Sequence, residues 1–134
     1  MNELYLFDSS VWINHFKQNK TAASDLLSTN LKENKSVLLC TVTVQEVLQG
    51  CKTLSILVVI EGLFEDLKKV PCQHYHAHQE AAKMYFTLRK KGITIRKPND
   101  CLIAFYAMEN KLTLVHDDVD FERIKEVFPL KTFH

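Results

Sequence analysis

The sequence predicts an α/β fold, a three-layer sandwich around a mostly parallel central sheet, and two observations support this. Short apolar stretches with strand character alternate along the chain with longer segments of helical periodicity. Acidic residues follow several of the apolar stretches directly. Alternating strands and helices favour a parallel sheet that is covered by helices. Because 134 residues is about the length of one domain, we expect a single domain over residues 1–134.

The first elements follow from apolar periodicity and capping residues. Residues 4–7 are apolar and end at Asp8, which predicts a buried strand. Ser9 and Ser10 are typical N-cap residues, and apolar residues follow them at helical spacing. A second amphipathic segment at 22–31 predicts another helix.

The next segment predicts a strand and two helices. Residues 37–42 are apolar and rich in β-branched side chains, so we expect a strand there. Thr43 and Glu46 have the spacing of a capping box and predict a helix that ends near Gly50. Residues 54–64 predict a further helix, which is apolar on more than one face.

The second half of the chain continues the alternation. Apolar residues recur at helical spacing over 77–88, and Gly92 is a natural stop for that helix. Pro98 and Asn99 introduce the next helix. The remaining predicted elements are a short strand closing at Val70, a strand at 112–115, a helix at 121–127 and a last strand at 130–133.

Bulk properties exclude some classes of protein. A net charge of +1 does not favour binding of long duplexes through charge alone, yet it permits an enzyme that holds a short RNA segment. None of the four cysteines lies in a C-x-x-C pair, so we expect reduced thiols rather than a zinc knuckle. The apolar stretch 54–60 is far shorter than the ~20 residues of a membrane span, and the N-terminus has no signal-peptide pattern. We therefore expect a cytoplasmic protein.

Acidic residues follow three of the predicted strands. The carboxyl ends of parallel strands form one edge of a sheet, where ligands bind, so these acids should converge. Asp100, at the N-terminus of a predicted helix, can join them. The acids concerned are Asp8, Glu46, Asp100, Asp117, Asp118 and Asp120.

Such a cluster has a chemical consequence. Carboxylates within a few ångströms of one another repel, so they need a cation or raised pKa values. Sites made of carboxylate oxygens suit hard ions such as Mg²⁺ and Mn²⁺. Bound ions of this kind activate water and stabilise the leaving oxygen in phosphodiester hydrolysis. The sequence therefore favours a metal-dependent phosphodiesterase.

Each acid also has a purely structural interpretation. Glu46 fits the capping box, and Asp100 fits a first-turn acid that favours the helix dipole. The acids at 117–120 fit a solvated turn with an N-cap. Asp8 ends a buried strand, and the sequence suggests no structural task for it. Their joint placement at strand ends favours the functional interpretation.

Four segments in order along the chain strengthen that interpretation. The segments are LFDSSVWI at 6–13, TVTVQEVLQG at 41–50, LRKKGITIRKPNDCLIAFYA at 88–107 and LTLVHDDVDFERI at 112–124. Together they resemble the PIN-domain nucleases, and especially the VapC-type toxins of bacterial toxin–antitoxin pairs. The resemblance covers essentially the whole chain. It implies a magnesium-dependent endoribonuclease that hydrolyses RNA phosphodiester bonds.

The resemblance also assigns the acids. Asp8, Glu46, Asp100 and Asp118 match the family's acidic quartet. Asp8 and Asp100 would be the principal Mg²⁺ ligands, with Mn²⁺ a substitute, and Asp118 would complete the metal site. Glu46 would bind the metal or orient water. Asp120 matches a frequent accessory acid.

Two neighbouring positions depart from that pattern. Asp117 matches nothing catalytic in the family. His116 stands where the family usually has a threonine or serine, just after the fourth strand. We expect His116 to be either an accessory group, hydrogen-bonding RNA or a carboxylate, or a structural residue.

The expected partners come from charge and from the resemblance. A basic stretch precedes Asp100, and it either solvates the surface or positions RNA phosphates. Its cations are Arg89, Lys90, Lys91, Arg96 and Lys97. The resemblance implies a homodimer that is silenced by a cognate antitoxin. The apolar helix at 54–64 is either buried in the core or part of a dimer or antitoxin surface.

Two other functions fit the same chain. One is a PIN ribonuclease of RNA processing that works without an antitoxin. The other is a non-enzymatic α/β interaction module whose acids are only caps and surface charges. A dehalogenase-type phosphatase fits poorly because Ser10 stands where a second aspartate is needed, and a response-regulator receiver fits poorly because Asp8 stands alone.

Overall fold

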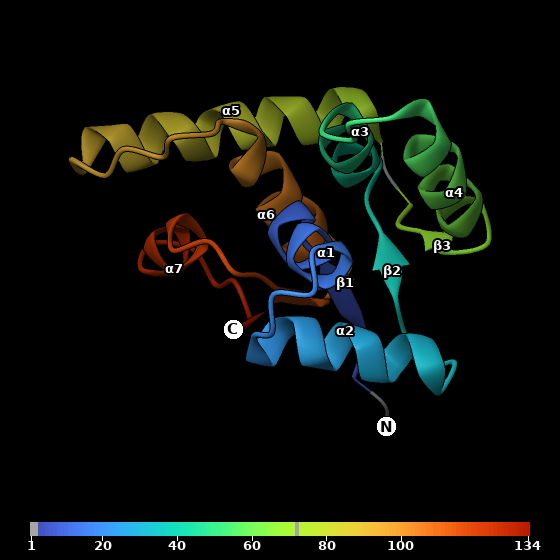
Figure 1. Ribbon diagram of the computed structural model, residues 1–134. Coiled ribbons are helices and arrows are strands. Elements are labelled where there is room, and N and C mark those ends of the chain that lie inside the picture. The colour runs from blue at the N-terminus through green and yellow to red at the C-terminus, as the bar shows by residue number, and fades with distance from the viewer. Residues whose placement is uncertain (1–2, 72) are drawn as a thin grey trace.

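The computed structural model describes residues 3–71 and 73–134. These residues form a five-stranded sheet in the order β3-β2-β1-β4-β5, and each neighbouring pair is parallel (Figure 1). The central strand is therefore the first in the chain. The strands are β1 (Tyr5–Phe7), β2 (Leu38–Leu39), β3 (Lys68–Lys69), β4 (Thr113–Val115) and β5 (Thr132–Phe133).

Helices cover both faces of the sheet. Successive strand side chains point to opposite faces, so Leu6 packs in one core cluster with α5, α6 and α7, while Phe7 packs in the other with α1, α2, α3 and α4. The three-layer α/β sandwich predicted from the sequence is confirmed. The helices are α1 (Ser9–Phe16), α2 (Ala22–Lys32), α3 (Thr41–Gln49), α4 (Leu54–Glu65), α5 (His74–Lys90), α6 (Asn99–Glu109) and α7 (Asp120–Lys125).

The end of α5 follows the glycine stop that the sequence predicts. Gly92 has φ +80°, a conformation that glycine adopts without steric cost. The N–H groups of Gly92 and Ile93 donate back to the carbonyls of Arg89 and Leu88 at 3.0 and 2.9 Å. This closed C-terminus redirects the chain, so the basic stretch turns back toward α6.

The predicted strand at 37–42 is wrong in its second half. Only Leu38 and Leu39 pair with neighbouring strands, and α3 begins at Thr41. Val42 and Val47 then pack against the two core clusters as helical residues. Burial on both sides thus outweighs the β preference of these branched side chains.

Cys40, Cys51 and Cys101 form no disulfide with one another, and Cys72 lies outside the described residues. Among the helices of residues 3–71 and 73–134, none is long and apolar enough to cross a membrane.

Candidate active site

Asp8 lies at the carboxyl end of β1 and is fully buried. Its main-chain N–H donates to the Val115 carbonyl at 2.9 Å, which joins the ends of β1 and β4. Its Oδ2 caps α1, accepting from the N–H of Ser10 at 3.0 Å and from the Ser10 hydroxyl at 2.6 Å. The expectation that Asp8 has no structural task is therefore wrong. However, Oδ1 is buried without a hydrogen-bond partner, so capping accounts for only half of this carboxylate.

Glu46 lies in the second turn of α3. Because Cys40 is the N-cap of this helix, the capping box predicted for Thr43 and Glu46 does not form. The Thr43 hydroxyl and Glu46 Oε1 are both buried without a hydrogen-bond partner, and their spacing places them on one side of the helix. Glu46 therefore does not serve as a capping residue. The Thr43 hydroxyl is a further buried polar group without a hydrogen-bond partner.

Asp100 lies in the first turn of α6, as predicted, and is fully buried. Its main-chain N–H donates to the Lys97 carbonyl at 2.9 Å, which fixes the start of the helix. Both carboxylate oxygens are buried and neither makes a hydrogen bond. An acid that only favoured a helix dipole would be solvated, so the dipole interpretation does not explain this burial.

Asp118 and Asp120 differ from these acids because cations hold them. Asp118 Oδ1 accepts from Arg96 Nη2 at 3.0 Å, and Lys97 Nζ lies 3.3 Å from Asp118 Oδ2. The fully buried Asp120 accepts from Arg96 Nε at 3.2 Å and from Arg123 Nη1 at 3.3 Å. We call Asp118 and Asp120 the paired carboxylates, and Asp8, Glu46 and Asp100 the unpaired carboxylates.

The two groups meet at the carboxyl edge of the sheet. One oxygen from each of Asp100, Asp118 and Asp120 lies within 4.8 Å of the others. The negative charges of Asp8, Asp118 and Glu46 all act on Asp100. The sequence-based quartet and its accessory acid are thus brought together from four elements and the loop after β4.

The proximity of these acids changes their pKa values. Burial and the charges of Asp8, Asp118 and Glu46 raise the pKa of Asp100 to about 8, against the opposing charge of Lys97. Burial also raises the pKa of Asp8 and, together with the Asp8 charge, that of Glu46. Burial acts in the same direction on Asp118, but the Asp120 N–H and the nearby cations outweigh it and lower the pKa.

The basic stretch divides into two parts. Arg96 and Lys97 face the paired carboxylates, whereas Arg89 and Lys90 lie on the last turn of α5. There they lie over aromatic rings, with Arg89 Cζ and Lys90 Nζ 5.8 and 5.6 Å from the ring centre of Phe86. Lys91 is exposed at the C-cap of α5. Arg96 and Lys97, two of the five cations predicted to contact phosphate, are therefore already paired with carboxylates.

His116 and Asp117 occupy the loop that follows β4. His116 is buried, and its ring accepts from the N–H of Asp118 at 3.1 Å through Nδ1. Asp117 Oδ2 accepts from Asn14 Nδ2 and from the Thr21 hydroxyl, both at 2.8 Å. Asp117 thus ties the loop to α1 and α2.

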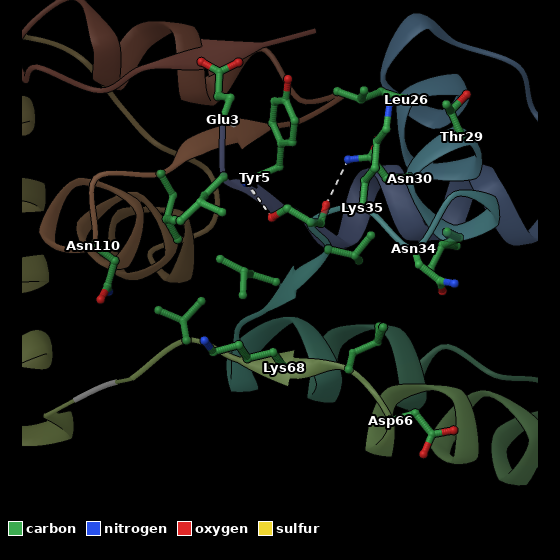
Figure 2. Close-up of a pocket in the computed structure, with 18 of the residues that line it drawn as sticks. Glu3, Tyr5, Leu26, Thr29, Asn30, Asn34, Lys35, Asp66, Lys68 and Asn110 are labelled. Carbon is green, nitrogen blue, oxygen red and sulfur yellow. Dashed lines mark hydrogen bonds between the residues drawn. The ribbon is translucent and has the colours of Figure 1, made fainter. Parts of the chain in front are cut away.

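The opposite edge of the sheet offers a hollow of about 940 Å³ (Figure 2). It opens at the amino-terminal ends of β1 to β4, where Ser36 accepts from the N–H of Tyr5 and from the amide of Asn30. The buried side-chain atoms without hydrogen-bond partners do not belong to residues that line this hollow. Volume alone therefore does not locate the reactive groups of this molecule.

The carboxyl edge fits a divalent cation. Buried oxygens without donors are the groups that a hard cation satisfies. Sequence reasoning missed two residues here, Arg123 and Glu122. The i,i+3 spacing of Asp120 and Arg123 is a helix ion-pair signal that could have identified the arginine. Nothing in the sequence marks Glu122, which lies 2.7 Å from the His116 ring through its Oε2.

Known proteins share this architecture. Ribonuclease VapC11 of Mycobacterium tuberculosis and a VapC ribonuclease of Mycobacterium bovis are each 28% identical to the chain over 129 residues, covering 96% of both chains. A VapBC-1 structure from nontypeable Haemophilus influenzae superposes with a TM-score of 0.73 at 22% identity, covering 97% of this chain and 96% of that one. DNA-bound VapBC from Salmonella typhimurium gives 0.72 at 22% identity, covering 98% of both.

The family assignment agrees with the fold and with the acids. The family model described as PIN domain matches residues 5–127, which runs from the first strand to just beyond the last helix. The matched span contains all five carboxylates of the candidate site. The chain therefore belongs to the PIN domain family.

Proposed function

We propose that this chain is a magnesium-dependent endoribonuclease and the toxin of a toxin–antitoxin pair. The observation that carries the proposal is the set of unpaired carboxylates, which leave four buried oxygens without a donor: Asp8 Oδ1, Glu46 Oε1 and both oxygens of Asp100. Membership of the PIN domain family and 28% identity to VapC ribonucleases support RNA as the substrate. Hydrolysis would place the hydroxyl of water on phosphorus and return a proton to the leaving oxygen.

Asp8, Asp100 and Asp118 would hold the metal ion. Asp120 approaches the same point, but its two arginines satisfy both of its oxygens, which makes it an accessory group. Bound Mg²⁺, or Mn²⁺ in its place, supplies a nucleophilic water at neutral pH and counters charge on the phosphodiester.

The remaining groups would act on water and phosphate. Glu46 is less buried than its neighbours, and its raised pKa suits it to hold or accept the proton of water at Oε1. Arg89, Lys90 and Lys91 are exposed and would contact RNA phosphates. Arg96 and Lys97 would first order the paired carboxylates and only then contribute charge to the substrate.

The protein partner would bind the apolar side of α4. Four aliphatic side chains of this helix are between 49% and 75% exposed, a large apolar surface for one helix of a small chain. They are Leu54, Ile56, Val58 and Val59. The VapBC structures that share this fold support a cognate antitoxin as the protein that binds α4. We further propose that the chain forms a homodimer and acts in the cytoplasm.

A metal titration with RNA cleavage tests the enzymatic part. Mg²⁺ or Mn²⁺ should raise the melting temperature, because only the folded chain binds the ion, and excess chelator should abolish cleavage. Cleavage at the full rate in chelator would contradict the metal site. The interaction module predicts no cleavage under any condition.

Expression in bacteria separates the toxin from an RNA-processing enzyme. A toxin should arrest growth, and the product of an adjacent small reading frame should relieve the arrest. Val59→Lys should keep cleavage and lose that relief, because a charge on the apolar side of α4 would oppose docking. Growth without arrest by an active nuclease would favour the processing enzyme.

A further inference from the structure

The residue that follows β4 makes contacts that the proposed reaction does not use. His116 is 1% exposed, and its main-chain N–H donates to the Phe133 carbonyl at 3.0 Å, which fixes it to β5. Its ring is stacked on the His134 ring and tilted against the Phe121 ring, with both centres 5.2 Å away. The imidazole is therefore held in one position by its surroundings.

Both ring nitrogens of His116 are occupied. The N–H of Asp118 donates to Nδ1 at 3.1 Å, so Nδ1 carries no proton. The ring proton then lies on Nε2, which donates to Glu122 Oε2 at 2.7 Å. The tautomer follows from the backbone donor, because two N–H groups cannot face each other. Glu122 stabilises this ring form, because its carboxylate accepts from Nε2.

The same spacing recurs one step further along the chain. The Asp118 carboxylate accepts through Oδ1 from the N–H of Asp120 at 3.0 Å, two residues ahead, as His116 accepts from Asp118. Two successive side-chain turns therefore shape the loop from 116 to 120. The orientation of the Asp118 carboxylate depends on the first of these turns, since that turn fixes its main chain.

We propose that His116 and Glu122 are positioning residues that hold Asp118 for metal binding, with the imidazole accepting from the Asp118 N–H. The inference rests on the proposed metal site. His116 stands where the family usually has a threonine or serine. A short hydroxyl side chain there would accept from the N–H two residues ahead, and His116 Nδ1 accepts from that N–H instead. Glu122, whose Oε1 also lies 3.9 Å from His134 Nε2, would act on Asp118 through the His116 ring.

The test compares variants that keep or remove the acceptor. His116→Leu removes it, whereas His116→Asn places an amide oxygen near the position of Nδ1. Glu122→Ala removes the group that orients the ring, and Glu126→Ala, which changes an exposed acid at the C-cap of α7, is the matched control. The readouts are Mn²⁺ affinity by calorimetry, melting temperature in chelator, and kcat and KM for RNA cleavage.

The expected result follows the acceptor. His116→Leu and Glu122→Ala should weaken Mn²⁺ binding roughly 10- to 100-fold, as losses of groups that orient metal ligands do. Their kcat should fall while KM for RNA stays close to wild type, because the phosphate contacts are unchanged. His116→Asn should recover most of the affinity, and Glu126→Ala should bind Mn²⁺ as wild type does.

Other results overturn the proposal. If His116→Leu does not fold, wild-type Mn²⁺ affinity in folded Glu122→Ala would make this pair purely structural. If His116→Leu folds and binds Mn²⁺ as tightly as wild type, this result alone would show that the pair is purely structural. A wild-type chain that binds no Mn²⁺ would overturn the proposed metal site itself, which separates the two failures.

Discussion

The unpaired and the paired carboxylates lie at the same edge of one sheet, yet they are held in opposite ways. Asp8 and Asp100 are buried with oxygens that no donor satisfies, and their pKa values are raised. Asp118 and Asp120 accept from Arg96, and the pKa of Asp118 is lowered. The site disfavours ionisation of the unpaired carboxylates, whereas the paired ones already have their counter-ions.

This difference shows how a small chain keeps five acids close together. Side chains from the loop before α6 and from α7 neutralise one group, so repulsion is concentrated on the other. A cation that binds the unpaired carboxylates relieves that repulsion and satisfies their oxygens. The structure thus separates Asp118 and Asp120, which form ion pairs with arginine or lysine, from Asp8, Glu46 and Asp100, which keep buried oxygens without a donor.

The largest effect is expected from Asp100→Asn. The variant should lose about 100-fold or more in cleavage rate, because a metal ligand matters at least as much as the groups that orient it. In chelator its stability should hold or rise, since one source of repulsion is removed. RNA cleavage in Mg²⁺ and thermal melts in chelator measure the two quantities.

Asp117→Asn is the matched control for that change. It alters the neighbouring acid that binds Asn14 and Thr21, so it should lower stability by about 1 kcal/mol and leave cleavage within a few-fold of wild type. Wild-type cleavage by Asp100→Asn would remove this acid from the site.

The next effect is a pH dependence of the metal-free chain. Asp100 keeps its proton up to about pH 8 in the folded state, whereas in the unfolded state it loses the proton near its ordinary value of 3.8. Between these values the folded chain binds more protons, so its free energy of unfolding should fall as pH rises. Asp118 has a lowered pKa and adds stability that is lost only at more acidic pH.

Urea denaturation in chelator at a series of pH values measures this slope. Asp100→Asn should flatten the decrease between about pH 4 and pH 8, and Mg²⁺ should bind more tightly as pH rises because binding displaces the proton. An equal slope in wild type and variant would assign the pH dependence to other groups.

Arg96→Met tests the paired carboxylates and should give the opposite sign to Asp100→Asn. The variant leaves the buried Asp120 with fewer donors, so stability in chelator should drop by about 1 kcal/mol, given that the arginine side chain is 66% exposed. Arg89→Met, at an arginine that lies over aromatic rings and forms no ion pair within residues 3–71 and 73–134, should change stability by less than ~0.5 kcal/mol. If Arg96→Met were as stable as Arg89→Met, the ion pairs of Arg96 with Asp118 and Asp120 would not contribute to stability.

The smallest effect concerns RNA binding by the exposed cations. Joint replacement of Arg89, Lys90 and Lys91 with glutamine should reduce the log–log salt slope of RNA binding by up to roughly 2, with kcat unchanged. Lys35→Gln with Lys68→Gln, at the opposite edge of the sheet, is the control and should leave the slope as it is (Figure 2). An unchanged slope in the triple variant would show that these cations only solvate the surface.

The order of elements and the edge at which the acids gather were predictable from the sequence. Apolar periodicity identifies β1, α5 and β4, and the carboxyl ends of parallel strands must share one edge. The end of α5 was predictable because glycine at position 92 permits a positive φ. The start of α3 was not, because burial on both sides of the segment at 41–47 decides between strand and helix.

The sequence by itself determined which acids stand at strand ends and helix starts, since both depend on local patterns. Only the tertiary structure decided which of them are paired. Arg96 reaches Asp118 and Asp120 from the loop before α6, which lies 22 and 24 residues earlier in the chain. Such contacts depend on where the chain folds back in space. Burial raises the pKa of the carboxylates that lack a cationic partner, because the cost of an unpaired charge rises as water is excluded, whereas the Asp120 N–H and nearby cations lower the pKa of Asp118.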